Sequence, residues 1–156
     1  MQATITWLGH STVRLTLPDE RVVLIDPWLA DNPACPAALK QPERCDLIVC
    51  THAHGDHVGD VAALLKRFKP IVVANYDLCL SLQRHAGAAR YEGMNTGGTI
   101  TIDGVRISLT RAYHSSAMET PDGLAYGGMP NGVVIGTEGL AGVYHAGDTD
   151  VFSDMS

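Results

Sequence analysis

The feature that most constrains this chain is a six-residue segment with four potential metal ligands, His52, His54, Asp56 and His57. An apolar segment over Asp46–Cys50, which we predict to be a strand, leads directly into it. His52 and His54 are two residues apart at the end of this strand, so their side chains are expected to point to the same side. Gly55 would allow a tight bend before the next helix. The sequence therefore predicts that all four ligands meet in one small volume.

The chemistry of these side chains indicates the kind of ion. Imidazole nitrogens combined with carboxylate oxygens suit zinc, manganese or iron better than calcium or magnesium. A helix N-terminus disfavours a protonated imidazole, so we expect His57 to stay neutral and able to bind a metal. The alternative is a polar loop rich in histidine, whose buried polar groups would then need other partners. We predict a metal site, with zinc as the first expectation.

The elements around this segment are predicted to alternate between strands and helices. Apolar side chains at helical spacing from Val58 to Phe68 predict a helix that Pro70 ends. A buried strand over Ile71–Ala74 follows, and Asn75 or Asp77 could cap a helix that runs to about Ala86. Residues rich in β-branched side chains predict three earlier strands, over Ala3–Leu8, Thr12–Leu17 and Val22–Ile25.

The rest of the chain is predicted to be mainly β structure. Turn residues indicate two hairpins, between Thr99–Ile102 and Val105–Leu109 through Asp103-Gly104, and between Val133–Thr137 and Leu140–His145 through Glu138-Gly139. The stretch Tyr113–Pro130 between them is predicted to be a long loop. Because loops of this length in compact domains are often functional, we expect it to lie on the substrate side.

Composition is typical of an ordinary globular protein. With 156 residues, 46% of them hydrophobic, the chain can form a single packed domain over residues 1–156. The net charge of −6 and the absence of a basic stretch argue against nucleic acid as a partner. No apolar run resembles a signal peptide or a membrane span, so we expect a cytoplasmic location and no membrane partner. The oligomeric state stays open, a homo-oligomer included. The cysteines show no CxxC spacing and are expected to be free and buried: Cys35, Cys45, Cys50 and Cys79.

The order His52-Ala53-His54-Gly55-Asp56-His57 resembles the HxHxDH signature of the metallo-β-lactamase superfamily. The opening Trp7–Thr12 is similar to the branch that contains ascorbate-6-phosphate lactonase and poorly characterised bacterial metal-dependent hydrolases. The resemblance extends over essentially the whole chain. It implies an α/β fold of αββα type, in which two β-sheets face each other with helices outside. Three further segments fit the superfamily: Ile25-Asp26-Pro27-Trp28, His114 within Arg111–Ser116, and Ala146-Gly147-Asp148-Thr149.

The resemblance also implies two divalent metal ions and assigns their ligands. One ion takes His52, His54 and His114, the second takes Asp56 and His57, and Asp148 bridges both. The superfamily normally supplies one more histidine to the second ion from a strand end well beyond this aspartate, but only Thr149–Ser156 follow Asp148 here. We therefore expect that the C-terminal part of the fold is absent and that the second ion lacks one protein ligand.

Two further residues have two interpretations each. Asp26 could orient a ligand imidazole or simply end a strand. His10 could face the metal pocket from the first hairpin or make a structural hydrogen bond. His145 alternates with apolar neighbours and is interpreted as structural. Ser115 and Ser116 are more easily explained by loop hydrogen bonds than by contact with a substrate.

A metal pair of this kind predicts hydrolysis of a small molecule, because bound divalent ions lower the pKa of water toward neutrality. Asp56 could orient that water or accept its proton, and His114 is the second residue expected at the catalytic site. The favoured substrate is a small ester, lactone or phosphoester, with a lactone or a phosphorylated sugar ester as the sharper expectation. The alternatives are phosphodiesterase or nuclease action, iron-based redox chemistry, and a non-catalytic metal-binding module.

Overall fold

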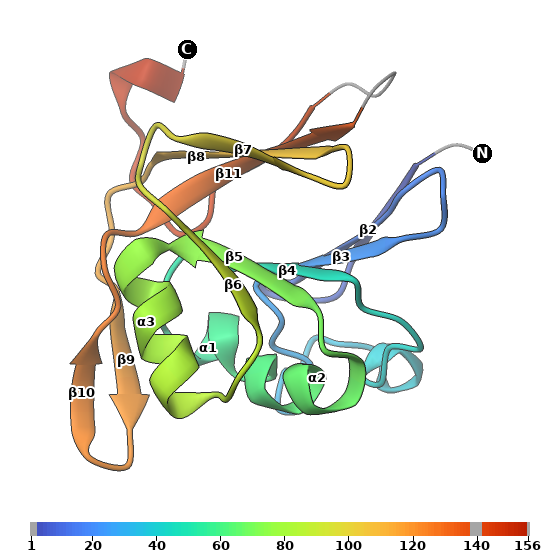
Figure 1. The fold of residues 1–156 in the computed structure, drawn as a ribbon, viewed down its shortest axis with the longest axis horizontal. Coiled ribbons are helices and arrows are strands. Elements are labelled where there is room, and N and C mark those ends of the chain that lie inside the picture. The colour runs from blue at the N-terminus through green and yellow to red at the C-terminus, as the bar shows by residue number, and fades with distance from the viewer. Residues whose placement is uncertain (1–2, 138–141, 156) are drawn as a thin grey trace.

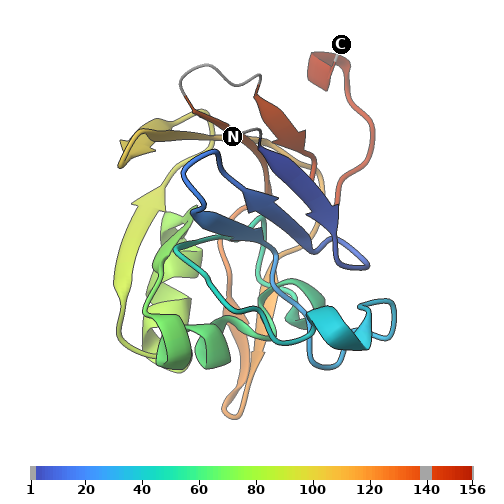
Figure 2. The same cartoon turned by 90° about the vertical axis from the view of Figure 1, so that its right-hand side faces the viewer.

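The computed structural model describes residues 3–137 and 142–155, and these form three stacked layers. A four-stranded sheet lies against a six-stranded sheet, and the helices cover the opposite face of the six-stranded sheet (Figures 1 and 2). These layers are the helix–sheet–sheet part of the expected αββα arrangement. Within residues 3–137 and 142–155, no α-helix covers the outer face of the four-stranded sheet.

The six-stranded sheet begins with antiparallel hairpins and continues with parallel strands. Its first three strands pair in antiparallel fashion and the last four pair in parallel, each with the next along the chain. Five of the six were expected from the sequence, whereas the strand over 90–94 was not. In order across the sheet they are β1 (Thr4–Trp7), β2 (Val13–Thr16), β3 (Val22–Ile25), β4 (Leu47–Val49), β5 (Ile71–Asn75) and β6 (Arg90–Met94).

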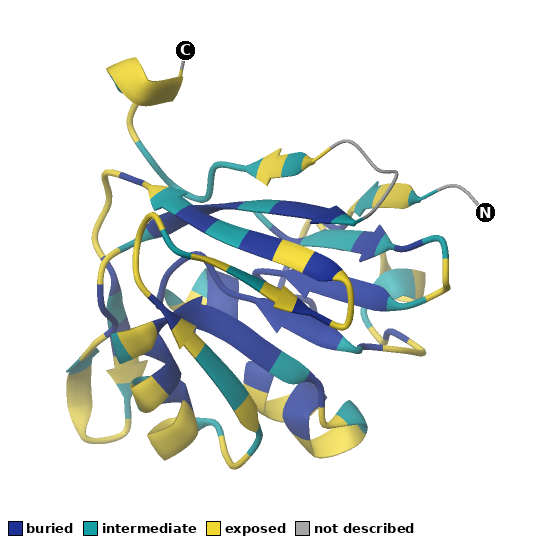
Figure 3. Cartoon of the chain, turned by 45° about the horizontal axis from the view of Figure 1, so that its top comes forward, coloured by how far each residue is buried: buried dark blue, intermediate teal, exposed yellow. Residues whose placement is uncertain are grey.

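Strand β3 shows why this sheet lies in the middle of the molecule. All four of its residues are buried, which is typical of a strand that is covered on both faces. Val23 and Ile25 pack into the core between the two sheets, while Val22 and Leu24 pack into the core beneath the helices. Figure 3 shows the same pattern, with buried strands in the centre and exposed residues on the outer sides of the helices.

The helical layer contains α1 (Gly55–Val58), α2 (Val61–Phe68) and α3 (Tyr76–His85). The sequence predicted α1 and α2 as one helix, and this is wrong. Asp60 separates them, because its backbone NH donates to the carbonyl of Pro27 at 3.0 Å and its carboxylate accepts the NH of Ala30 at 3.1 Å. The expected cap of α3 is confirmed, since the Asn75 side chain accepts the NH of Asp77 at 3.0 Å.

The four-stranded sheet consists of β7 (Thr99–Ile102), β8 (Val105–Arg111), β11 (Asn131–Thr137) and β12 (Val143–His145). The hairpin of β7 and β8 is confirmed. Strands β11 and β12 pair in antiparallel fashion as expected, but the turn predicted at Glu138-Gly139 lies outside the described residues. Both β8 and β12 are antiparallel to β11, so they run in the same direction and end at the same edge of the sheet.

The stretch Tyr113–Pro130, predicted to be a loop, contains a hairpin instead. Strands β9 (Ala117–Thr120) and β10 (Gly123–Tyr126) pair in antiparallel fashion around Pro121-Asp122. Their hydrogen-bonded pairing is stabilised by contact with the helical layer, where Ser81 donates to the carbonyl of Tyr126 at 2.8 Å. The glycine and proline residues that suggested a loop lie at the turn and ends of this hairpin.

The cysteines behave as small apolar residues. All four are free and buried, as the sequence predicted. Burial raises the pKa of Cys45 and of Cys79 to about 12, so these thiols stay protonated at neutral pH. Across the part of the chain that the structure describes, no helix has both the length and the apolar content needed to cross a bilayer.

Leu24 lies in the middle sheet beneath the helices, so a substitution there tests the layered core directly. Leu24 is fully buried under the helices, whereas Leu80 on α3 is 48% exposed. We expect Leu24→Ala to lower the free energy of unfolding by about 2–5 kcal/mol, because it leaves a cavity that the layers cannot fill. Leu80→Ala should change it by less than about 0.5 kcal/mol. Urea unfolding followed by circular dichroism measures both, and equal effects of the two variants would contradict the layered core.

Candidate metal centre

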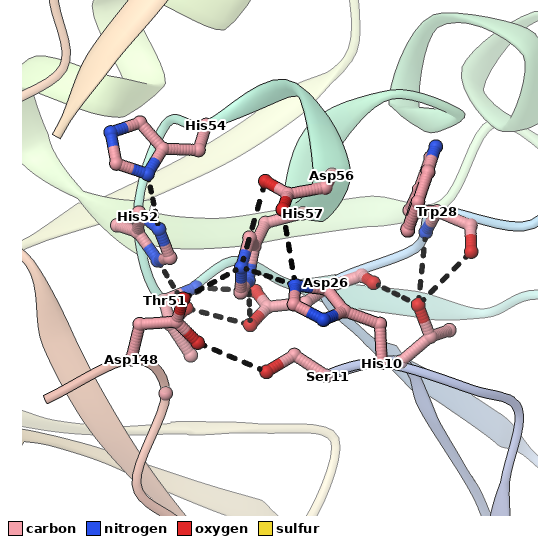
Figure 4. Close-up of polar contacts among 12 residues, drawn as sticks. His10, Ser11, Asp26, Trp28, Thr51, His52, His54, Asp56, His57 and Asp148 are labelled. Carbon is pink, nitrogen blue, oxygen red and sulfur yellow. Dashed lines mark hydrogen bonds and ion pairs between the residues drawn. The ribbon is translucent and has the colours of Figure 1, made fainter. Parts of the chain in front are cut away.

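Four strand ends meet at one edge of the two sheets. The parallel strands β3 and β4 end at Ile25 and Val49, so the residues that follow them lie side by side. From the facing sheet, β8 and β12 end at the same edge and are followed by His114 and Asp148. The fold therefore brings together side chains that are up to 122 residues apart in the sequence, from Asp26 to Asp148. Figure 4 shows most of these residues around one small region.

The buried carboxylate of Asp26 organises this region. Asp26 is 0% exposed, and it lies immediately after β3. Its Oδ1 accepts the backbone NH of Thr51 at 2.7 Å, and its Oδ2 accepts the Thr51 hydroxyl at 2.6 Å. The same Oδ2 lies 2.9 Å from Nδ1 of His57 (Figure 4). Of the two interpretations of Asp26, the structure supports the one in which it orients an imidazole.

These contacts determine which ring nitrogen of His57 and of His52 carries the proton and which one has a free lone pair. A carboxylate only accepts, so Nδ1 of His57 carries the proton, and Nε2 presents its lone pair to the centre. Because the Thr51 hydroxyl donates to Asp26, it must accept from Nδ1 of His52, which lies 3.0 Å away. Nε2 of His52 is therefore also free. The Asp26 carboxylate thus fixes both rings in the tautomer whose Nε2 is able to bind a cation.

The first group of potential ligands consists of His52, His54 and His114. Each offers a nitrogen, and these atoms lie within 4.8 Å of one another. Nε2 of His52 is 3.0 Å from Nδ1 of His54, as expected for side chains on the same side of the strand end. Nε2 of His54 is 3.2 Å from the Ser115 hydroxyl, which can hold the ring in place. The structure thus brings His114 to the partners that the resemblance gave it.

The second group lies on the other side of Asp148. Oδ2 of Asp148 is 3.5 Å from Nε2 of His57 and 3.8 Å from Nε2 of His114, so this carboxylate faces both groups. Asp56 lies beside His57, with 3.8 Å between its Oδ1 and Nε2 of that ring. Nε2 of His10 also reaches this group, at 3.2 Å from Nε2 of His57. His10 therefore faces the pocket, which was one of the two possibilities.

Burial and charge act differently on the two buried imidazoles. Burial lowers the pKa of His52 to about 4, and the neighbouring His57 adds to this, so His52 is neutral at physiological pH. Burial would also lower the pKa of His57, but the hydrogen bond to Asp26 and the charges of the nearby aspartates outweigh it and raise this pKa. This direction is opposite to the effect expected of a helix N-terminus on the His57 pKa. Helix α1 has only four residues, and the carboxylates dominate.

The position of Asp148 depends on the preceding Gly147, whose backbone lies close to Asn131 and Thr51. Gly147 has a φ of 65°, and a Cβ there would lie 2.9 Å from the carbonyl oxygen of Asn131 and 3.0 Å from Cβ of Thr51. His145 accepts the NH of Gly147 at 3.1 Å and donates to the carbonyl of Ser11 at 2.8 Å. His145 is thus structural, as interpreted from the sequence. Gly55, in contrast, needs no special conformation, and a Cβ there would meet nothing within 4 Å.

Three supporting residues were missed or underestimated from the sequence. Thr51 connects Asp26 to His52, and the only sequence signal was its position between the strand and the ligands. Ser11 donates to Oδ1 of Asp148 at 3.3 Å. Ser115 contacts His54, whereas Ser116 is a loop residue that donates to the carbonyl of Gly127 at 3.1 Å.

The donor set fits divalent metal ions. Tetrahedral zinc with bonds of about 2.0–2.1 Å holds its ligand atoms about 3.3 Å apart. The separations of 3.0–3.8 Å between neighbouring nitrogen and oxygen atoms here are close to that value. Imidazoles and carboxylates are also the ligand types that zinc, manganese and iron share. The residues of both groups could therefore hold a metal.

Comparison with known proteins identifies the family of the chain. A family model described as a beta-lactamase superfamily domain matches residues 21–156. A UPF0173 metal-dependent hydrolase of Rubrobacter xylanophilus is 45% identical over 152 residues, which are 97% of this chain and 62% of that protein. A second protein with that description, from Koribacter versatilis, is 40% identical over 97% of this chain and 64% of its own length.

A solved structure shows the same fold. Igni18, a metallo hydrolase from the hyperthermophilic archaeon Ignicoccus hospitalis, matches with a TM-score of 0.82 and 34% identity. The match covers 98% of this chain and 64% of Igni18. Fold and ligand segment together define a domain of the metallo-β-lactamase type. The chain belongs to the β-lactamase superfamily, and it spans less than two thirds of the length of these relatives.

The role of Asp26 can be tested by removing its charge. Asp26→Asn keeps the size of the side chain but replaces one carboxylate oxygen with an NH2 group. Only one oxygen then remains to accept the hydrogen bonds that two oxygens accept in the wild type. We expect zinc affinity to fall about 10–100-fold, because His52 and His57 lose their fixed tautomers. Asp46→Asn is the matched control, since Asp46 accepts the NH of Val22 at 2.8 Å in another part of the sheet. Competition with a chromophoric chelator measures the affinities, and an unchanged affinity of Asp26→Asn would contradict the role assigned to Asp26.

Proposed function

We propose that this chain forms the metal centre of a hydrolase that uses two divalent ions, zinc in first place, to cleave a small ester, lactone or phosphoester. One observation carries the proposal. Two groups of imidazoles lie on either side of a single carboxylate, that of Asp148, which faces both. Such an arrangement suits a pair of ions that share one bridging ligand. The relatives described as metal-dependent hydrolases support it.

The protein side chains define what such a centre does. Bound divalent ions would supply positive charge that polarises the substrate and lowers the pKa of water toward neutrality. His52, His54 and His114 would hold one ion, His57 and Asp56 the other, and Asp148 would contact both. The Asp56 side chain is 45% exposed, so it faces solvent as well as the centre. It is therefore placed to orient a water molecule or to accept its proton.

The hairpin of β9 and β10 forms one wall of the proposed substrate site. A hollow of about 460 Å³ next to the centre is lined by His54, Asp56 and, from the hairpin, Glu119 and Leu124. A second hollow of about 660 Å³ is lined by His114 and Ser115 and also by Tyr126 and Met129. These volumes suit a small molecule rather than a polymer. Lactones and phosphorylated sugar esters are the preferred classes.

Turnover of generic substrates tests the proposal. We expect the zinc-loaded chain to hydrolyse simple lactones or bis-nitrophenyl phosphate, and chelation to abolish this activity. His54→Ala should reduce turnover by about 100-fold or more, since it removes a ligand rather than a supporting group. His85→Ala is the matched control, because His85 is an exposed histidine at the end of α3. Zinc binding without turnover of any lactone or phosphoester would favour a non-catalytic metal-binding module instead.

A further inference from the structure

His10 reaches the second ligand group from a part of the chain that the resemblance does not connect with metal binding. It lies in the turn between β1 and β2, and its ring points toward His57 and Asp56 (Figure 4). Its Nε2 is 3.2 Å from Nε2 of His57 and 3.2 Å from Oδ2 of Asp56. The same nitrogen also belongs to a group with Asp148 whose ligand atoms lie within 4.8 Å of one another.

The donor atoms of this group lie close enough to share one ion, since those of His10, His57 and Asp148 are within 4.8 Å of one another and Asp56 contacts both rings. Nε2 of His10 lies 3.2 Å from Nε2 of His57 and 3.2 Å from Oδ2 of Asp56. Nε2 of His57 lies 3.5 Å from Oδ2 of Asp148 and 3.8 Å from Oδ1 of Asp56. A zinc ion with bonds of about 2.0–2.1 Å would hold four ligands about 3.3 Å apart. Two imidazoles and two carboxylates can therefore surround one ion here.

The facing nitrogens of the two rings support coordination. Nδ1 of His57 donates to Asp26, so its Nε2 carries a lone pair that points to Nε2 of His10. A cation between the two nitrogens can use the lone pairs of both rings. Without a cation, the contact between the two nitrogens can only be a hydrogen bond.

The backbone holds His10 in an uncommon conformation. Its φ is 49°, in the left-handed region that non-glycine residues rarely adopt. Gly9 before it has a φ of 96°, and a Cβ there would lie 2.8 Å from the backbone carbon of Ala34. The carbonyl of His10 accepts the indole NH of Trp7 at 2.8 Å, and the ring of Trp28 contacts the imidazole edge-on with centroids 5.7 Å apart. These contacts fix the direction in which His10 points.

We infer that His10 is a direct ligand of the second metal ion, which it binds together with His57, Asp56 and Asp148. This inference rests on the proposed two-ion centre. It gives this ion a second imidazole beside that of His57. The ligand comes from the N-terminal hairpin, so the first and last parts of the described chain hold the same ion.

The experiment compares metal stoichiometry and affinity, and not only activity. Wild-type protein, His10→Asn, His10→Gln and the control His85→Asn are titrated with zinc against a chromophoric chelator, and bound zinc is counted by elemental analysis after gel filtration. Asparagine tolerates a positive φ, so His10→Asn preserves the turn. Glutamine can replace a hydrogen bond from His10 to Asp56 but is a poor zinc ligand. Circular dichroism checks that each variant is folded.

We expect two zinc ions in the wild type and in His85→Asn. In both His10 variants the second ion should bind at least about tenfold more weakly, while the affinity of the first ion is unchanged. If His10→Gln binds both ions as tightly as the wild type, His10 acts only through hydrogen bonding and the inference is wrong, although the two-ion proposal survives. A wild type that binds fewer than two ions overturns both.

Discussion

The candidate metal centre depends on the burial of one carboxylate, that of Asp26. A charge removed from water is tolerated only when its oxygens are fully paired. Asp26 meets this condition with the backbone NH and hydroxyl of Thr51 and with the ring of His57. These partners belong to the segment that follows β4, so the ends of two parallel strands are joined by the same contacts that orient the imidazoles. Asp26 therefore both stabilises the fold and orients the imidazoles.

The layered fold places the other potential ligands opposite this carboxylate. The apolar core between the sheets, which includes Val23, Ile25, Ile107 and Val133, fixes the sheets face to face. Since β8 and β12 end at the same edge, the loops that carry His114 and Asp148 are neighbours. They are also tied directly, because the backbone NH of Tyr113 donates to the hydroxyl of Thr149 at 2.9 Å. Packing in the core between the sheets thus sets the distance between the two groups of potential ligands.

Much of this arrangement could be predicted from the sequence, because its signals are local. Short segments rich in β-branched and apolar residues indicated the strands, and the spacing of His52, His54, Asp56 and His57 indicated the potential ligands. Features that depend on tertiary contacts could not be predicted. The role of Thr51 requires Asp26 to be its neighbour in space, and the raised pKa of His57 results from aspartates brought by other segments. The hairpin of β9 and β10 was missed because its turn residues are equally typical of loops.

The most direct test is to locate the ions themselves. Crystals of the zinc-loaded protein, measured at the zinc absorption edge, should show two anomalous peaks about 3.5–4 Å apart. One peak should lie within bonding distance of His52, His54 and His114, the other of His57 and Asp56, with Asp148 between them. The hydrogen bonds that Asp26 accepts from Thr51 and His57 should be unchanged in the same crystals. An absence of anomalous density at this edge of the sheets, in a protein that binds zinc elsewhere, would contradict the account.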